Sequence, residues 1–390
     1  SESCYHTLLQ TYNSLVVLFF IKQVFLQVIG GVFKMKLNKK IIGIGLVAVA
    51  ALGLAACARG GRGGSAADSK VKAAIVTDTG GVDDKSFNQS AWEGLQAWGK
   101  ANKLEKDSGF TYFQSNSESD FATNMSSAVD QNYNLIFGVG FALHDAVSES
   151  AKDNEKINYV IIDDVVKDQK NVESVLFADN EGAYLAGIAA AMQSKTNKVG
   201  FIGGQKSDTI TRFEAGFTAG AKSVKPDIDV QVQYAESFSD AAKGSTIAST
   251  MYASGADVIY QAAGGTGTGV FTAAKEVNEK LSADSDKKVW VIGVDRDQSA
   301  EGNYTSSDNK KSNFVLTSTI KQVGAVVKDI ANDQVKGKKF EGGKTKTYGI
   351  KDGGVDIVTS NLPSDIKDAV VKAKDQIKNG ELKPTDGLSK

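Results

Sequence analysis

Polar and aromatic side chains gather in short segments that each follow a run of apolar, β-branched residues. Two such segments cover residues 77–89 and 138–145, and their candidate binding residues are Asp78, Asp84, Phe87, Asn88 and Asp145. A carboxylate accepts hydrogen bonds from N–H and O–H groups, and an aromatic ring packs on a flat apolar face. These residue types therefore indicate recognition of a small polar molecule that has a flat part.

Four further segments follow the same pattern later in the chain. They cover residues 212–213, 262–269, 293–298 and 317–321, and they contribute Phe213, Gly264, Gly265, Asp295 and Lys321. The two adjacent glycines allow the backbone to approach a ligand where a Cβ atom would clash. A phosphate-binding P-loop is excluded, because it requires Lys and then Ser or Thr after its last glycine. Val270 and Phe271 stand at those positions.

The pattern of apolar residues predicts the scaffold that brings these segments together. We expect strands at residues 73–77, 135–139, 159–162, 199–202, 230–234, 258–260, 289–293 and 314–319, and helices at 88–100, 121–131, 181–193, 211–223, 240–252 and 269–279. Such alternation predicts an α/β fold in which helices cover both faces of parallel sheets. Ligands bind these sheets beyond the carboxyl ends of the strands, where the candidate residues fall.

Chain length predicts two lobes, because roughly 320 residues beyond residue 70 exceed one typical domain. We expect lobe 1 to comprise residues 71–178 plus about 296–325, and lobe 2 to comprise 179–295 plus about 326–390. A last helix is expected to begin with Ser364 as its cap and to end at Gly380. Its apolar face would consist of Ile366, Val370, Ala373 and Ile377.

The segment before these lobes has the order of a bacterial lipoprotein signal. A basic start after Met35 precedes an apolar run over residues 41–52, and small residues then lead to Cys57. Signal segments have this order, and the apolar run is shorter than the ~20 residues of a spanning helix. We expect residues 35–56 to be a signal peptide, Cys57 to carry lipid and the Gly-rich residues 57–70 to form a flexible tether. Residues 1–34 are expected to be an upstream mistranslation.

Composition excludes several classes of function. Beyond residue 56 the chain is mildly acidic, which argues against nucleic-acid binding, because that requires a basic surface. Cys57 and His144 are the only cysteine and histidine in this part. We therefore expect no disulfide, no metal site and no cofactor. Asp163 and Asp164 are similar to a catalytic or metal-binding pair, but we expect them to form a solvated strand end.

Three segments in one order are specific in combination: DKSFNQSAWEG from Asp84, AAGGTGTGVF from Ala262 and GVDRDQ from Gly293. Together they resemble the basic membrane protein family of bacterial lipoproteins, from about Val71 to the C-terminus. The resemblance implies a two-lobed, type I periplasmic-binding-protein fold that closes on a purine nucleoside and delivers it to an ABC importer. It implies a permease and an ATPase as partners, and a location on the extracytoplasmic face of the cell membrane. We expect a monomer.

The resemblance also implies a role for each candidate residue. Phe87 and Phe213 would enclose the base, one from each lobe, and Asp145 would accept a hydrogen bond from its N–H edge. Further polar contacts to the ligand would come from Asp78, Asp84 and Asn88. The ribose hydroxyls would meet Asp295, Lys321 from across the cleft, and the backbone of Gly264 and Gly265. Taken singly, these residues could equally be core aromatics, a helix cap at Asp145 and a tight turn at the glycines.

Two other functions remain open. Residues 77–84 are faintly similar to the Asp-Thr-Asp-Pro-Gly-x-Asp-Asp signature of nucleoside hydrolases, which bind calcium through clustered carboxylates. Val76 and Thr79 replace two signature residues, and an extra residue follows Gly80, so we expect a protein that is not an enzyme. The other alternative is a binding lipoprotein for a sugar or a signalling molecule, since sugar-binding proteins of this fold also use aromatic rings and carboxylates.

Overall fold

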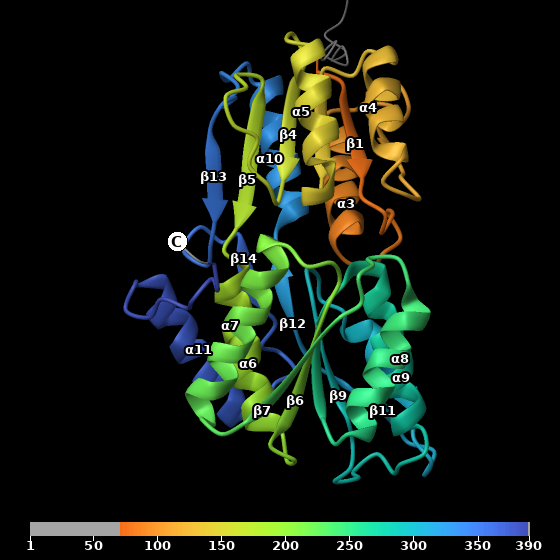
Figure 1. Ribbon diagram of the computed structural model, residues 1–390, viewed down its shortest axis with the longest axis vertical. Helices are drawn as coiled ribbons and strands as arrows, with labels where there is room; N and C mark the ends of the chain where they lie inside the picture. The colour runs from red at the N-terminus through yellow and green to blue at the C-terminus, as the bar shows by residue number, and fades with distance from the viewer. Residues whose placement is uncertain (1–70, 389–390) are drawn as a thin grey trace, which may run out of the picture. The chain divides into compact units, whose positions relative to one another are not determined.

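The computed structural model describes residues 71–388, which form two lobes that are each built on a six-stranded sheet (Figure 1). The signal segment, Cys57, the tether and residues 1–34 lie outside the described residues. Within residues 71–388, none of the helices combines the length and the apolar character needed to cross a bilayer. The predicted α/β architecture with parallel sheets is confirmed.

Lobe 1 contains the sheet with strand order β13-β5-β4-β3-β1-β2, in which all neighbouring strands are parallel. Its strands are β1 (Ala73–Thr77), β2 (Phe110–Phe113), β3 (Leu135–Val139), β4 (Asn158–Ile162), β5 (Val172–Phe177) and β13 (Thr345–Tyr348). Its helices are α3 (Phe87–Ala101), α4 (Asp120–Asp130), η1 (Phe141–Leu143), α5 (His144–Asp153) and α10 (Val323–Val335). Helices α3 and α10 pack together on one face, and α4 and α5 lie on the other (Figure 1).

Side-chain alternation along the strands explains why both faces of this sheet are covered. Successive residues of a strand point to opposite faces. Ile75 packs in the same apolar cluster as Trp98 of α3, whereas Val76 packs in the cluster that contains Phe121 and Met125 of α4. The strand is therefore buried on both sides, which its continuous apolar sequence requires.

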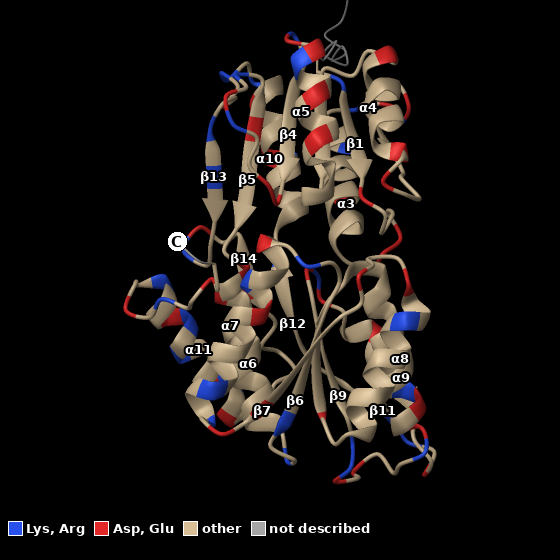
Figure 2. Cartoon of the chain, in the orientation of Figure 1, with Lys and Arg blue, Asp and Glu red and all other residues tan. Residues whose placement is uncertain are grey.

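Lobe 2 contains the sheet with strand order β14-β12-β9-β8-β6-β7, which is parallel except for β14. Its strands are β6 (Lys198–Gly203), β7 (Asp229–Tyr234), β8 (Val258–Ala262), β9 (Trp290–Gly293), β12 (Val315–Lys321) and β14 (Val355–Ile357). Its helices are α6 (Asp179–Gln193), α7 (Asp208–Val224), α8 (Ala241–Ala253), α9 (Gly264–Asn278), η2 (Ser299–Gly302) and α11 (Ser364–Lys378), and a small hairpin joins β10 (Asn303–Thr305) to β11 (Lys311–Asn313). Charged side chains are spread over the helices and loops of both lobes, while the strands are largely uncharged (Figure 2).

The predicted lobe boundaries need two corrections, one for residues 296–325 and one for the first part of residues 326–390, which was expected in lobe 2. Residues 296–325 were expected in lobe 1, but β12 pairs with β9 and β14 in the second sheet. The segment from α10 to β13 returns instead to lobe 1, where α10 packs on α3 at Gly94 and Gly324. A Cβ atom on Gly94 would lie 2.1 Å from the carbonyl oxygen of Gly324, so this approach requires glycine. Within the described residues the chain thus crosses between the sheets after β5, after β12 and after β13.

Local sequence signals were sufficient to predict most features of the last helix, α11. Its buried face consists of Ile366, Val370, Ala373 and Ile377, as the spacing predicts. Gly380 follows the helix with a φ of 79°, the left-handed conformation that favours glycine. The predicted cap was wrong, because Ser364 is the first helical residue and Pro363 precedes the helix.

Candidate ligand-binding site

The carboxyl ends of strands from both sheets meet around one cavity. The space between its lining atoms is about 480 Å³ and includes space that is open to solvent. Lobe 1 lines it with Asp78, Gly80, Asp84, Phe87, Asn88, Gly140, Phe141 and Asp163, and lobe 2 lines it with Thr209, Ile210, Phe213, Phe238, Ala262, Gly264, Val294, Asp295 and Lys321. The site therefore requires both lobes.

A buried polar network lies between β1 and α3. The side-chain amide of Asn88 donates to Asp78 at 2.7 Å and to Asp84 at 2.9 Å. Asp78 also accepts from the backbone N–H of Gly80, and Asp84 accepts from backbone N–H groups at the start of α3. Burial raises the pKa of Asp78 to about 7, and burial also raises the pKa of Asp84. Asp84 accepts four hydrogen bonds from the chain itself, which fills its acceptor sites. Both hydrogen bonds to the Asp78 side chain end on one oxygen, so its other oxygen can bind a polar hydrogen of a ligand.

Asp295 links the lobes from the loop after β9. Its carboxylate accepts a short hydrogen bond from the hydroxyl of Ser86 in lobe 1. Burial raises the pKa of Asp295 to about 6, although the Lys321 ammonium acts in the opposite direction. Gln298 of the same loop donates to the carbonyl oxygen of Lys85 at 2.9 Å. The loop after β9 therefore contacts the segment before α3.

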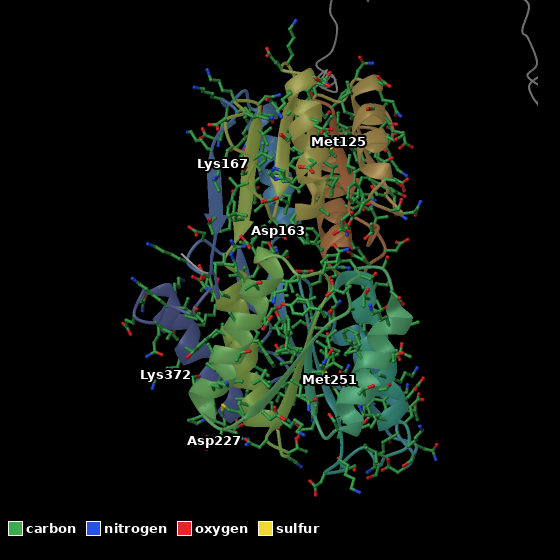
Figure 3. All side chains as sticks on the ribbon, viewed as in Figure 1. Met125, Asp163, Lys167, Asp227, Met251 and Lys372 are labelled. Atoms are coloured by element: carbon green, nitrogen blue, oxygen red, sulfur yellow. The ribbon has the colours of Figure 1, made fainter. Side chains whose placement is uncertain are left out.

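Lys321 ends β12 and lies at the junction of the lobes. Its ammonium donates to Asp163 at 2.7 Å and to Asp179 at 3.2 Å, and all three side chains are buried. Figure 3 places Asp163 between the two lobes. Burial would lower the pKa of Lys321, but the carboxylates of Asp163, Asp179 and Asp295 outweigh it and raise this pKa. The ammonium therefore stays charged at neutral pH.

Aromatic rings surround this ammonium. Its nitrogen lies 5.2 Å from the ring centroid of Phe87, 5.1 Å from that of Phe177 and 5.5 Å from that of Phe213. Such distances allow cation–π attraction. Phe87 comes from α3 and Phe213 from α7, so each lobe contributes a ring to the cavity. A second interlobe pair, Phe141 and Phe238, has ring centroids 6.0 Å apart.

The glycine segment after β8 begins α9 directly. Gly264 has a φ of 53° and lines the cavity, so a side chain here would be strained. Gly265 does not line the cavity. A Cβ atom on it would lie 3.0 Å from the carbonyl oxygen of Phe238. The two glycines therefore have different roles, one beside the cavity and one in packing against the loop before α8.

Most predicted site residues come together in this cavity: Asp78, Asp84, Phe87, Asn88, Phe213, Gly264, Asp295 and Lys321. Asp145 does not, because it lies exposed in the first turn of α5. The structure therefore gives no support to a base contact by Asp145. Lys321 does not face Asp295 from across the cleft either, since both belong to lobe 2 and the Lys321 backbone N–H donates to the Asp295 carbonyl oxygen.

Sequence reasoning missed several residues of the cavity. Asp163 was expected at a solvated strand end, but it is buried and paired with Lys321, while only Asp164 is partly exposed and bonded to His144. The sequence analysis also did not predict three residues that line the cavity, Phe141, Phe238 and Thr209. Asp179 does not line the cavity but forms an ion pair with Lys321. Asp163 directly follows β4, so its position at the end of a strand was the sequence signal that could have identified it as a site residue.

Only two of the three aspartates that are faintly similar to a hydrolase signature come together. Asp83 is exposed, whereas Asp78 and Asp84 are buried and bridged by Asn88. Among residues 71–388 there is no group of three or more His, Cys, Asp or Glu side chains arranged to hold a metal ion. The carboxylates instead bind amide, hydroxyl and ammonium donors of the chain itself.

Comparisons with known proteins agree with this geometry. Residues 71–385 match the family model Bmp, described as "ABC transporter substrate-binding protein PnrA-like". The chain is 60% identical to the "ABC transporter nucleoside-binding protein BmpA" of Lactococcus lactis, over 89% of this chain and 99% of that one. It is 51% identical to the "CD4+ T-cell-stimulating antigen" of Listeria monocytogenes, over 80% and 87% of the two chains.

The fold is similar to that of solved solute-binding proteins. One from Aeropyrum pernix superposes with a TM-score of 0.67 at 24% identity, and the match covers 80% of this chain and 92% of that one. This likeness supports the fold, and the family match supports the role. The chain belongs to the Bmp family of PnrA-like ABC transporter substrate-binding proteins.

Proposed function

We propose that this protein captures purine nucleosides (guanosine, inosine and adenosine) outside the cytoplasmic membrane for an ABC importer. The observation that carries the proposal is a cavity lined by one phenylalanine from each lobe, Phe87 and Phe213, together with buried carboxylates. A purine has two flat faces and a polar edge, which these groups match. The lactococcal relative, named as nucleoside-binding, supports the same ligand class.

The two ends of the cavity suit the two parts of a nucleoside. At one end, Asp78 offers a carboxyl oxygen for the edge of the base, and Asn88 and Asp84 hold this carboxyl group in place. At the other end, Asp295 offers acceptor oxygens for the ribose hydroxyls, and Lys321 offers an N–H donor. The backbone at Gly264 lies close enough for the sugar to contact it without a Cβ atom between them.

Ligand binding closes the two lobes in this proposal. Groups from both lobes line the site, so a ligand that contacts all of them binds the closed arrangement better than an open one. The three chain crossings serve as the hinge, since a few residues between lobes can absorb such a rotation. The closed protein then docks, as a monomer, on a permease that works with an ATPase.

Lipid on Cys57 anchors the protein at the extracytoplasmic face of the cell membrane. Cys57 follows a basic and apolar segment with small residues directly before it. Two acyl chains give stable membrane attachment where one is marginal. The variant Cys57→Ala should be released or remain an unprocessed precursor. Normal lipid labelling of that variant would contradict the anchor.

Binding without chemistry is part of the proposal. Groups that hold the ground state and the transition state equally well do not accelerate a reaction. Inosine incubated for hours with the protein and calcium should therefore stay intact on chromatography. Release of hypoxanthine beyond the amount of protein, abolished in an Asp78→Ala, Asp84→Ala double variant, would favour a hydrolase instead.

Titration calorimetry tests the ligand class directly. Residues 71–390 should bind guanosine, inosine and adenosine, and should bind the free bases and D-ribose more weakly. Tighter binding of pentoses than of nucleosides would favour the sugar-binding alternative. No binding of any nucleoside would contradict the proposed function.

A further inference from the structure

The cavity has a strong imbalance of charge. Lys321 is the only Lys, Arg or His among the described residues that line it, whereas Asp78, Asp84, Asp163 and Asp295 all do. Asp179 adds a further buried carboxyl group next to Lys321. An anionic group that entered this space would meet several carboxyl groups and one ammonium group.

That ammonium is already neutralised by the protein. Two of its three N–H donors go to Asp163 and Asp179, and aromatic rings surround it. One donor remains, which suits a single neutral acceptor such as a hydroxyl group. A phosphate, with its charge of about −1.5 to −2 at neutral pH, requires several donors.

Asp163, the carboxyl group beside Lys321 that lines the cavity, also requires a hydrogen from the ligand. One oxygen of Asp163 and one of Asp179 are buried without a hydrogen-bond partner among residues 71–388. A ligand hydroxyl can donate to the Asp163 oxygen and accept from Lys321 in the same position. An ionised phosphate or carboxylate has no hydrogen to donate, so the Asp163 oxygen would face another negative oxygen.

From this arrangement we infer that Asp163 makes the site selective for uncharged ligands and excludes phosphorylated nucleosides, while Asp179 holds Lys321 from outside the cavity. The inference rests on the proposed nucleoside function and adds to it a mechanism of rejection. Discrimination between related ligands often depends on such repulsive contacts as well as on attractive ones. The importer would then receive dephosphorylated nucleosides, so a phosphate-removing reaction outside the membrane must precede capture of ligands that arrive as nucleotides.

The test compares two ligands that match in shape and differ in charge. Adenosine 5′-carboxamide is neutral, and adenosine 5′-carboxylate is anionic at neutral pH. Calorimetry on the wild-type protein should give a preference for the carboxamide of about a hundredfold or more, because like charges in a desolvated site repel strongly. Equal affinities would overturn the inference, and equal rejection of both compounds would show that size and not charge excludes them.

Two variants test whether Asp163 causes the preference for the uncharged ligand. Asp163→Asn keeps the size and the left-handed backbone conformation, and it should reduce the preference about tenfold. The matched control is Asp164→Asn, which removes the neighbouring, partly exposed carboxylate and should leave the preference unchanged. An unchanged preference in folded Asp163→Asn would overturn the role of Asp163.

Further measurements separate this inference from the proposed function. Asp163→Gly also removes the carboxylate, suits the left-handed backbone at this position and should likewise reduce the preference, which keeps the test valid if Asp163→Asn does not fold. Circular dichroism establishes folding for each variant. Adenosine itself is the reference: if it binds while the preference is absent, only the exclusion mechanism fails. If adenosine does not bind the wild-type protein, the proposed function fails and this inference falls with it.

Discussion

Arg296 of lobe 2 donates from one guanidinium nitrogen to both carboxylate oxygens of Glu93 in lobe 1, at 3.0 Å each. Arg296 directly follows Asp295, and Glu93 lies on α3 two turns after Phe87. The pair is partly exposed and does not line the cavity. It therefore joins the lobes next to the site without occupying ligand space.

Removing this pair should weaken the closed state. A partly exposed ion pair contributes about 0.2–1 kcal/mol, so Glu93→Gln should weaken nucleoside affinity by a factor between about 1.4 and 5. Small-angle scattering should show less compaction at a given ligand concentration. The control is Glu279→Gln, which removes an ion pair within lobe 2. An affinity loss of the same size in both variants would assign the effect to net charge and not to closure.

The rings of Phe87 and Phe213 should contribute to the binding affinity for every purine nucleoside. Replacement of either residue by Leu retains apolar volume but removes the ring, which costs about 0.5–1.5 kcal/mol beyond buried area. We expect calorimetry to give affinities reduced about two- to tenfold for guanosine, inosine and adenosine alike. Phe213 also packs against Tyr260, so thermal unfolding must be measured for each variant. Unchanged affinity in both stable variants would contradict the proposed stacking.

Asp295 should discriminate between the nucleoside and the free base. Asp295→Asn leaves ribose hydroxyls with a poorer acceptor, at a cost of about 1–3 kcal/mol, and should largely spare hypoxanthine. Ser86→Ala is the matched control, because it removes the contact between the lobes and keeps the carboxylate. If Ser86→Ala lowers inosine affinity as much as Asp295→Asn does, the carboxylate acts through lobe contact and not through ribose.

Asp78 should make the folded protein less stable as pH rises. Burial raises the pKa of Asp78 from its ordinary value of 3.8 to about 7, so the folded state holds this proton more tightly than the unfolded chain. Stability attributable to the neutral carboxyl is full below about pH 4 and is lost as pH rises to about 7. The melting temperature of Asp78→Asn relative to wild type should therefore increase over this interval.

The control for this pH dependence is Asp145→Asn. It changes formal charge in the same way at an exposed position outside the cavity. Its melting temperature should follow that of the wild-type protein across the interval. A constant difference between Asp78→Asn and wild type from pH 4 to pH 8 would contradict the raised pKa.

Local patterns were sufficient to predict the scaffold. β3 was predicted with its observed bounds, and the buried face of α11 was predicted residue by residue. Both follow from side-chain periodicity, which depends on neighbours within a few positions. Most of the cavity could be predicted in the same way, because residues directly after parallel strands must lie at one edge of a sheet.

Tertiary structure alone decided which lobe each late segment joins and which charges meet. β12 and α10 are adjacent in sequence but lie in different lobes. β12 is hydrogen-bonded to β9 in lobe 2, whereas α10 packs closely on Gly94 in lobe 1. Asp163 and Asp164 are neighbours of the same type, but only Asp163 meets Lys321, which is 158 positions away. Asp145, which η1 separates from the end of β3, remains exposed in the first turn of α5. Local sequence carries the periodicity of each element, whereas pairing and burial depend on contacts between elements far apart in the chain.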